Sequence, residues 1–206
     1  MEAEKYLKYI VQEIHSTVFA TVDSKGRPVT CAIDIMDYDE SGLYLLTARG
    51  KHFYDRLKAN ENIAFTAMKG EDTLSCVAVS VQGKVKEIGP SRLPDLFEKN
   101  PYMAQIYPSE SSRQALTVFK IYEGTGEWFD LSKKPVERAS FAFGGAAGVK
   151  SGYFVTDRCT GCKRCVSQCP QNCIDIRGGT AVICQEHCLH CGNCFEICPV
   201  KAVERR

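Results

Sequence analysis

Apolar positions near the start of the chain recur at the spacing of an amphipathic helix. They predict a helix over residues 3–14, with one buried face formed by Ala3, Leu7, Ile10, Val11 and Ile14. From residue 17 onward the pattern becomes one of β-branched and aromatic blocks, some strictly alternating, bounded by turn residues. These blocks predict strands at residues 17–22, 29–35, 42–47, 63–68, 76–88, 116–122 and 127–131, with short helices at 52–59, 91–100 and 101–107.

The order of these elements predicts the fold class. Most of the strands follow one another directly, which disfavours parallel βαβ winding and favours a small closed barrel. The first part of the chain is therefore expected to be mainly β with short helices, an α+β arrangement. The length of 206 residues leaves room for one more small domain. We place the barrel at residues 1–146 and the second domain at residues 147–206, joined by the Gly-rich stretch 144–152.

Charge and targeting signals narrow the classes of function. The formal net charge is +1, which excludes a strongly basic nucleic-acid-binding surface as a bulk property. The sequence shows no secretory signal and no apolar stretch of about 20 residues, so we expect a cytoplasmic protein without membrane contact. Of the 12 cysteines, ten fall between Cys159 and Cys198. In a reducing cytosol, such a concentration favours metal or redox chemistry over disulfides.

Eight of these cysteines form two runs with the same spacing. Cys-x2-Cys-x2-Cys-x3-Cys-Pro begins at Cys159 and again at Cys188, and this is the run of bacterial two-cluster ferredoxins. One tight loop supplies three thiolates to a cubane, and the fourth comes from the other run. The spacing predicts two [4Fe-4S] clusters, with cluster I held by Cys159, Cys162, Cys165 and Cys198, and cluster II by Cys188, Cys191, Cys194 and Cys169.

The two runs are an internal repeat with a period of 29 residues. Two further cysteines, Cys173 and Cys184, then align with Ala202 and Val155, which cannot bind iron. We therefore expect both cysteines to be buried small residues rather than ligands. A zinc site is the rival hypothesis, but the usual pair of CxxC knuckles lacks the third cysteine and the Cys-Pro of these runs.

The charge of the cysteine-rich segment is also informative. Residues 151–206 carry seven basic and five acidic side chains, whereas mobile ferredoxins are usually acidic. This balance favours a built-in relay over a diffusing carrier. It would also attract an acidic external ferredoxin as electron donor.

Three pieces of the first 145 residues resemble the FMN-binding split barrel of the pyridoxamine 5'-phosphate oxidase superfamily. They are TVFATVDSKGRPVTCAIDI, LYLLTARGKHFYDRLKANENIAFTAM and VSVQGKVKEIG, in this order. The first is a strand–turn–strand whose second strand lines the flavin in that family, and the second is a strand, a basic turn and a helix followed by another strand. The resemblance covers about residues 5–145 and implies a split β-barrel that binds FMN.

The basic turn in the second piece has a chemistry of its own. Thr47, Arg49 and Lys51 stand between a strand and the start of a helix. Exposed amides at a helix N-terminus, a hydroxyl group and two cations together make a phosphate site. In the resembling family this turn holds the phosphate of FMN, and a solvated basic turn is the structural alternative.

The resemblance also implies what surrounds the isoalloxazine ring. The strand residues expected along the ring, with one neighbour packed nearby, are Thr30, Cys31, Ala32, Ile33 and Leu46. Trp128, the only tryptophan, follows a Gly-rich stretch, and in the family an aromatic residue from a late strand often reaches the flavin across the dimer interface. We therefore expect a homodimer with flavin at the interface. Ordinary core packing is the alternative for Trp128 and for the strand residues.

The chain departs from the true oxidases at the end of the barrel. Those enzymes end in an Arg-containing segment that binds the substrate phosphate, whereas here LSKKPVERASFAFGG runs directly into the cysteine-rich segment. Oxygen as electron acceptor would also endanger nearby cubanes. We therefore do not expect oxidation of pyridoxamine 5'-phosphate.

Flavin and clusters in one small chain imply electron transfer between them. The leading hypothesis is an enzyme, an FMN-dependent iron–sulfur oxidoreductase that passes electrons between two [4Fe-4S] clusters and FMN, to or from a small organic substrate. The alternative is a non-enzymatic electron-transfer flavoprotein or adaptor that acts on a protein redox partner. A third hypothesis is a barrel that binds another ligand, such as F420 or haem. The sequence assigns no catalytic acid or base.

Overall fold

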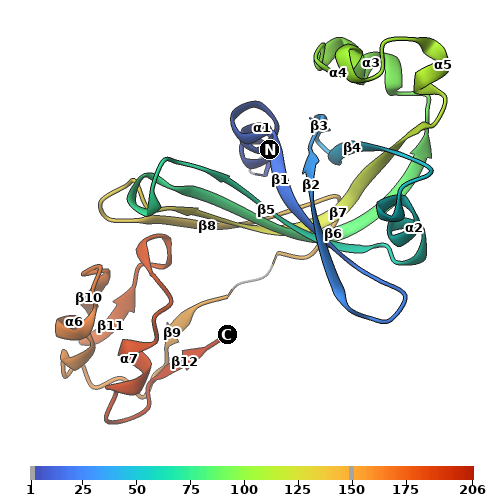
Figure 1. The fold of residues 1–206 in the computed structure, drawn as a ribbon. Helices are drawn as coiled ribbons and strands as arrows, with labels where there is room; N and C mark the ends of the chain where they lie inside the picture. The colour runs from blue at the N-terminus through green and yellow to red at the C-terminus, as the bar shows by residue number, and fades with distance from the viewer. Residues whose placement is uncertain (1–2, 149–150) are drawn as a thin grey trace. The chain divides into compact units, whose positions relative to one another are not determined.

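The computed structural model describes residues 3–148 and 151–206 (Figure 1). These residues divide into two compact units. The sheet unit comprises residues 3–69, Ala78–Glu127 and Phe141–Gly148, and the cysteine unit comprises Gly70–Val77, Trp128–Ser140 and residues 151–206. The division follows spatial contacts rather than one point in the sequence, so the boundary between residues 146 and 147 stays a prediction.

Eight strands form the main sheet. They are β1 (Ser16–Val22), β2 (Pro28–Asp34), β3 (Asp37–Asp39), β4 (Gly42–Ala48), β5 (Asn62–Lys69), β6 (Val77–Gly89), β7 (Leu116–Asp130) and β8 (Glu137–Phe143). Their hydrogen-bonded order is β2-β1-β5-β6-β7-β4-β3, and β8 pairs with β7 (Figure 1). Among the described residues this order has two ends, and the predicted fold class, mainly β with short helices, is confirmed.

Strand β7 is a single long strand, although the sequence predicts two strands separated by a Gly-rich turn. The glycines are explained by close packing against β8, a strand that was not predicted from the sequence. A Cβ atom on Gly124 would lie 2.7 Å from the Phe143 ring, and one on Gly126 would lie 2.2 Å from the Phe141 ring. Glycine is therefore needed inside this strand because two aromatic rings lie directly on it.

Short helical elements precede or connect these strands along the chain. They are α1 (Glu4–Tyr9), which continues as the π-helical turn η1 (Ile10–Ile14), then α2 (His52–Ala59), η2 (Thr73–Ser75), α3 (Leu93–Lys99), α4 (Met103–Ile106) and α5 (Glu110–Arg113). The predicted helices at residues 3–14 and 52–59 are confirmed. Helix α1 packs on the sheet through Tyr6, whose ring stacks on Phe141 at 4.6 Å between centroids.

The core of the sheet unit is built from alternating positions. On β1, Phe19 is fully buried and contacts Phe53 and Phe65, at ring centroid distances of 5.5 Å and 5.7 Å. On β4, Leu43, Leu45 and Thr47 are buried opposite Ile121, Phe119 and Thr117 of β7. The opposite face of β4 packs against α3 and α4 in a second core that contains Tyr44, Leu96 and Met103.

The cysteine-rich segment folds as two short hairpin-like pairs with intervening helical turns. Strand β9 (Tyr153–Val155) pairs with β12 (Val203–Arg205), and β10 (Ile174–Arg177) pairs with β11 (Thr180–Ile183). The helical elements are α6 (Arg164–Gln168), η3 (Gln185–His187) and α7 (Asn193–Glu196). No helix in residues 3–148 or 151–206 has the length and apolar character needed to cross a membrane.

The backbone confirms the internal repeat. Residues with positive φ recur in pairs 29 positions apart, at Gly161 (64°) and His190 (56°), Lys163 (66°) and Gly192 (83°), and Asn172 (50°) and Lys201 (48°). Each pair occupies the left-handed region, which non-glycine residues seldom adopt. The two cysteine runs therefore fold into equivalent loops.

Candidate functional site

The four cysteines predicted for cluster I surround one small cavity. Cys159, Cys162, Cys165 and Cys198 all line an enclosed space of about 20 Å³. Two backbone amides point at its sulfur atoms, because Ala181 N–H donates to Cys159 Sγ at 3.3 Å and Ala202 N–H donates to Cys198 Sγ at 3.2 Å. Such N–H···S bonds stabilise the thiolate form and tune the potential of iron–sulfur clusters. The donor set fits a cubane.

The thiols of this set also act on one another electrostatically. Burial raises the pKa of Cys165, and the thiolates of Cys159, Cys162 and Cys198 raise it further. These three are the partners that the ferredoxin spacing assigns to Cys165. Iron binding would relieve this repulsion, since the metal holds all four sulfurs as thiolates.

The second set converges in the same way. Burial raises the pKa of Cys194 to about 11, and Cys188 and Cys191 contribute to the shift. Burial also raises the pKa of Cys188, and the negative charges of Cys169 and Cys191 raise it further. The hydrogen bond that His190 N–H donates to Cys188 Sγ at 3.4 Å lowers this pKa. Cys188 and Cys194 are buried, whereas Cys191 is exposed.

Within the described residues, no three cysteine, histidine or carboxylate side chains converge closely enough to hold one metal ion. A mononuclear zinc site needs four donors about 2.0–2.3 Å from a single centre. A cubane binds each thiolate at a different iron corner, so its ligands stand further apart.

The two remaining cysteines of the segment differ from each other. Cys173 is buried as expected, and its Sγ lies 3.4 Å from Cys169 Sγ, a contact with a predicted ligand that the sequence did not indicate. Its backbone N–H donates to Cys169 Sγ at 3.4 Å, just as its repeat partner Ala202 donates to Cys198. Cys184 is exposed, so the expectation that it is buried was wrong. It directly follows β11, where the chain has already reached the surface.

The predicted flavin strand presents its residues to two sides. On β2, Cys31 and Ile33 are half-buried, whereas Thr30 and Ala32 are exposed. Cys31 lies opposite the buried Phe19 of β1, and Ala32 lies opposite Val18. Because strand side chains alternate between faces, one flat ring system can pack against only one of these pairs.

Helix α2 brings cations to the half-buried side of this strand. Arg56 Nε donates to Thr21 Oγ1 at 2.7 Å, which fixes the guanidinium against β1. Burial raises the pKa of Cys31, while the charges of Arg56 and Lys51 lower it, so both cations lie near the thiol. Arg56 was not predicted from the sequence. Its one-turn spacing from the basic turn along α2 is the signal that could have found it.

The basic turn has mixed support from the structure. Thr47 Oγ1 is buried without a hydrogen-bond partner, and buried hydroxyls seldom lack one. Lys51 is the N-cap of α2 and provides no side-chain cap, so the first amides of the helix are uncapped. The Arg49 guanidinium is already engaged, because it donates to the Gln114 carbonyl at 2.9 Å.

Two predicted residues lie elsewhere. Leu46 packs on the opposite face of β4 from Thr47, against the α3–α4 core. Trp128 is half-buried on β7, in the part of this strand that belongs to the cysteine unit, and its expected contact with the flavin across a dimer interface stays a prediction.

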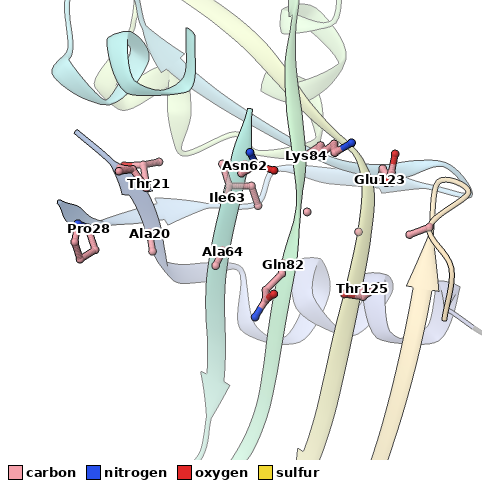
Figure 2. A pocket seen from close by; sticks show the side chains of 14 residues that line it. Ala20, Thr21, Pro28, Asn62, Ile63, Ala64, Gln82, Lys84, Glu123 and Thr125 are labelled. Carbon is pink, nitrogen blue, oxygen red and sulfur yellow. The ribbon is translucent and has the colours of Figure 1, made fainter. Parts of the chain in front are cut away.

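A groove of about 440 Å³ crosses the sheet unit at β1, β5, β6 and β7 (Figure 2). The side chains of Ala20, Ala64, Gln82 and Thr125 line it, and none of the predicted flavin residues does. Thr21, which binds Arg56, also lines the groove.

Comparison with known families decides the class of the sheet unit. Residues 3–126 match the family described as pyridoxamine 5'-phosphate oxidase. The chain belongs to the pyridoxamine 5'-phosphate oxidase family. Among solved structures, a NimC/NimA family protein from Clostridium acetobutylicum is similar to this family member with a TM-score of 0.54 and 17% identity, over 69% of this chain and 90% of that one. At this identity the likeness shows the fold alone, a split barrel.

The C-terminal part of this pyridoxamine 5'-phosphate oxidase family member is a 4Fe-4S dicluster domain, matched over residues 158–202. One component of an ion-translocating oxidoreductase complex from Methanosarcina acetivorans is 48% identical over 48 residues, 23% of this chain and 18% of that protein. The PorD component of pyruvate synthase from Methanothermobacter marburgensis is 42% identical over 48 residues, 23% of this chain and 56% of that protein. The chain thus spans little more than half of one of these relatives and less than a fifth of the other. The likeness is confined to the ferredoxin-type segment.

Proposed function

We propose that this protein is an FMN-dependent iron–sulfur oxidoreductase that passes electrons between two [4Fe-4S] clusters and FMN, to or from a small organic substrate. One observation carries the proposal. The same chain contains two complete sets of four cysteines and a domain of the pyridoxamine 5'-phosphate oxidase family in which one helix begins with a cation and uncapped amides. When bound, FMN would supply the exchange between two-electron and one-electron chemistry, and each cluster carries one electron at a time.

In this proposal the phosphate of FMN binds at the start of α2. Lys51 supplies a cation, the uncapped amides of α2 supply donors, and Thr47 Oγ1 is the unpaired hydroxyl nearby in the chain. Arg56 adds positive charge close to Cys31. Cys31 and Ile33, rather than Thr30 and Ala32, would pack against the ring system from this chain.

The exposed side of β2 suggests how a second copy would take part. Val18 lies opposite Ala32 and is 60% exposed, and Met68 on the neighbouring β5 is 61% exposed. Large apolar side chains on adjacent strands support a homodimer that covers this face. The measurement is the solution mass by light scattering, and Val18→Asp should convert a dimer into monomers. A wild-type mass of one chain would contradict this part of the proposal.

The main experiment uses protein purified without oxygen. We expect the visible flavin absorption band and about eight iron atoms per chain, four for each cubane. The chemically reduced protein is then mixed with a panel of enones, quinones and nitroaromatics. Rapid reoxidation by one class supports an enzyme. Reoxidation only by proteins would support the adaptor alternative instead, and the absence of flavin from anaerobic protein would overturn the proposal.

A further inference from the structure

The repeat allows the surroundings of the two clusters to be compared position by position. Three basic residues flank the ligands of cluster I, namely Lys163 and Arg164 after Cys162 and Lys201 after Cys198. Their equivalents 29 residues away, beside the ligands of cluster II, are Gly192, Asn193 and Asn172. Residues with positive φ recur at matching positions of the two loops. At the three compared positions the side chains differ, with three cations beside cluster I and none beside cluster II.

Two of these cations line the cluster I site, and Lys201 directly follows its lining residue Val200. Lys163, Arg164 and Val200 line the same cavity as the four cysteines. All three basic residues are exposed, and so are the ligand Cys162 and the apolar Val200, which is 39% exposed. An exposed ligand allows a partner to approach the cluster closely. An apolar centre with a charged rim is typical of a protein interface.

Two of the cations stand where the backbone does not favour them. Lys163 has a φ of 66°, and its repeat partner is Gly192, the residue type best suited to that conformation. Lys201 has a φ of 48°, and its partner is Asn172, which also tolerates the left-handed region. The sequence thus places lysine at two positions where local conformation favours glycine or asparagine. Such local cost is characteristic of functional sites.

Two residues near the ligands of cluster II, Gln171 and His187, are bonded to another segment of the chain. The side-chain carbonyl of Gln171 accepts a hydrogen bond from Val136 N–H at 3.3 Å, and His187 Nδ1 lies 2.9 Å from the Val136 carbonyl oxygen. Gln171 is the repeat partner of Val200. The position that is exposed and apolar beside cluster I is therefore, beside cluster II, polar and bonded to another segment of the cysteine unit.

We propose that the surface formed by Lys163, Arg164, Val200 and Lys201, the cluster I surface, is the docking site of a small acidic one-electron carrier protein. The carrier gives one electron to cluster I. The carrier is oxidised and the cluster reduced by one electron, and no bond or proton is transferred. The inference rests on the proposed function, because it assumes that the clusters exchange electrons. It adds the surface at which an electron from outside enters the protein and the sign of the charge on the carrier protein.

The test compares the wild type with the triple variant Lys163→Gln/Arg164→Gln/Lys201→Gln. A matched control, Lys8→Gln/Lys25→Gln/Lys133→Gln, removes the same charge from three other exposed lysines. The probe is a plant-type [2Fe-2S] ferredoxin of net negative charge. Binding of the oxidised probe is measured by calorimetry, and cluster reduction by the reduced probe is followed by stopped-flow absorbance at several salt concentrations.

At low salt, we expect the triple variant to bind the probe at least about tenfold more weakly than the wild type and to accept its electron at least about tenfold more slowly. Both the affinity and the rate should depend less on salt concentration in the variant. The control variant should behave like the wild type. An equal loss in both variants, or wild-type binding and rates in the triple variant, would overturn the inference.

Two further arms separate this inference from the proposed function. Photoreduced deazaflavin, an uncharged small reductant, should reduce the clusters of the wild type and of the triple variant at equal rates, which shows that the variant is folded and loaded. If electrons from deazaflavin then fail to reach FMN in the wild type, the proposed function fails while the docking result stands. Cytochrome c, a basic acceptor, should oxidise the reduced triple variant at least as fast as the reduced wild type. Slower oxidation of the variant would contradict docking by charge.

Discussion

The sheet unit and the cysteine unit gain their stability by different means. The sheet unit has a core of large hydrophobic side chains, in which Phe19 and Phe119 are almost completely buried and contact other aromatic rings. The core of the cysteine unit includes Cys173, Cys188 and Cys194, and half-buried predicted ligands pack around it. In the sheet unit the proposed flavin site lies on a fold that has its own hydrophobic core, whereas in the cysteine unit the predicted cluster ligands are part of the core. We therefore expect the units to respond differently to loss of their cofactors.

The largest effect should follow removal of iron. Anaerobic treatment with a chelator and an oxidant should unfold the segment of residues 151–206, because small metal-binding domains fold with their metal. The sheet unit should keep its structure. Hydrogen exchange with mass spectrometry checks both, with fast exchange expected for 151–206 and unchanged protection for β1 and β4. If residues 151–206 stayed protected from hydrogen exchange after iron loss, the expected difference between the two units would be contradicted.

The next effect concerns the core of the sheet unit. Phe19→Ala should lower the free energy of unfolding of this unit by about 3–5 kcal/mol, because it leaves a cavity between Phe53 and Phe65. The iron content per chain should not change. The matched control is Ile106→Ala, at a position that is 60% exposed, where we expect less than about 0.5 kcal/mol. Denaturant unfolding followed by far-UV circular dichroism gives both values, and a similar loss in the two variants would refute the assignment.

A smaller effect is expected at the proposed phosphate site. Lys51→Ala should weaken FMN binding by about tenfold, which corresponds to about 1.4 kcal/mol, because one charge-assisted contact is lost. Lys8→Ala, also exposed in the sheet unit, is the control and should bind FMN normally. Fluorescence titration of flavin-free protein measures both affinities. An unchanged affinity in Lys51→Ala would mean that the phosphate lies elsewhere.

The smallest effect is a pH dependence of the sheet unit. Burial tends to raise the pKa of Asp39, but hydrogen bonds from Tyr44 and Ser41 and the charge of Lys120 lower it to about 2. A carboxyl whose pKa is lower in the folded state stabilises the fold above its unfolded pKa and loses that contribution as pH falls through the folded value. Asp39 is 41% exposed, so solvent screening keeps the contribution below about 1 kcal/mol.

Asp39→Asn should therefore reduce the stability difference of the sheet unit between about pH 4 and pH 2. Urea unfolding of the wild type and the variant at the two pH values measures this. If Asp39→Asn and the wild type lose equal stability on acidification, the assigned network around Asp39 is wrong.

The two sites were predictable from sequence to different degrees. The cluster ligands follow from spacing, since a tight loop places three thiols by local geometry and the repeat supplies the fourth. The proposed flavin site depends on tertiary packing. Strand alternation alone places Leu46 and Thr47 on opposite faces of β4, but the sequence did not show that the face of Leu46 packs against the α3–α4 core. Arg56 was missed because its approach to Cys31 depends on how α2 packs against β1. Strand β8 was missed because it pairs with a part of β7 whose glycines gave that part the composition of a turn, so the sequence showed no strand for β8 to pair with.

The central claim is that electrons pass between the clusters and FMN in this chain. Freeze-quench electron paramagnetic resonance of the intact, cofactor-loaded protein tests it most directly, after mixing with a reduced one-electron carrier. We expect the signal of reduced [4Fe-4S] clusters to appear first and to decay as the visible absorption of the flavin is lost. Loss of the flavin absorption without any earlier cluster signal, or clusters that stay reduced beside oxidised flavin, would contradict it.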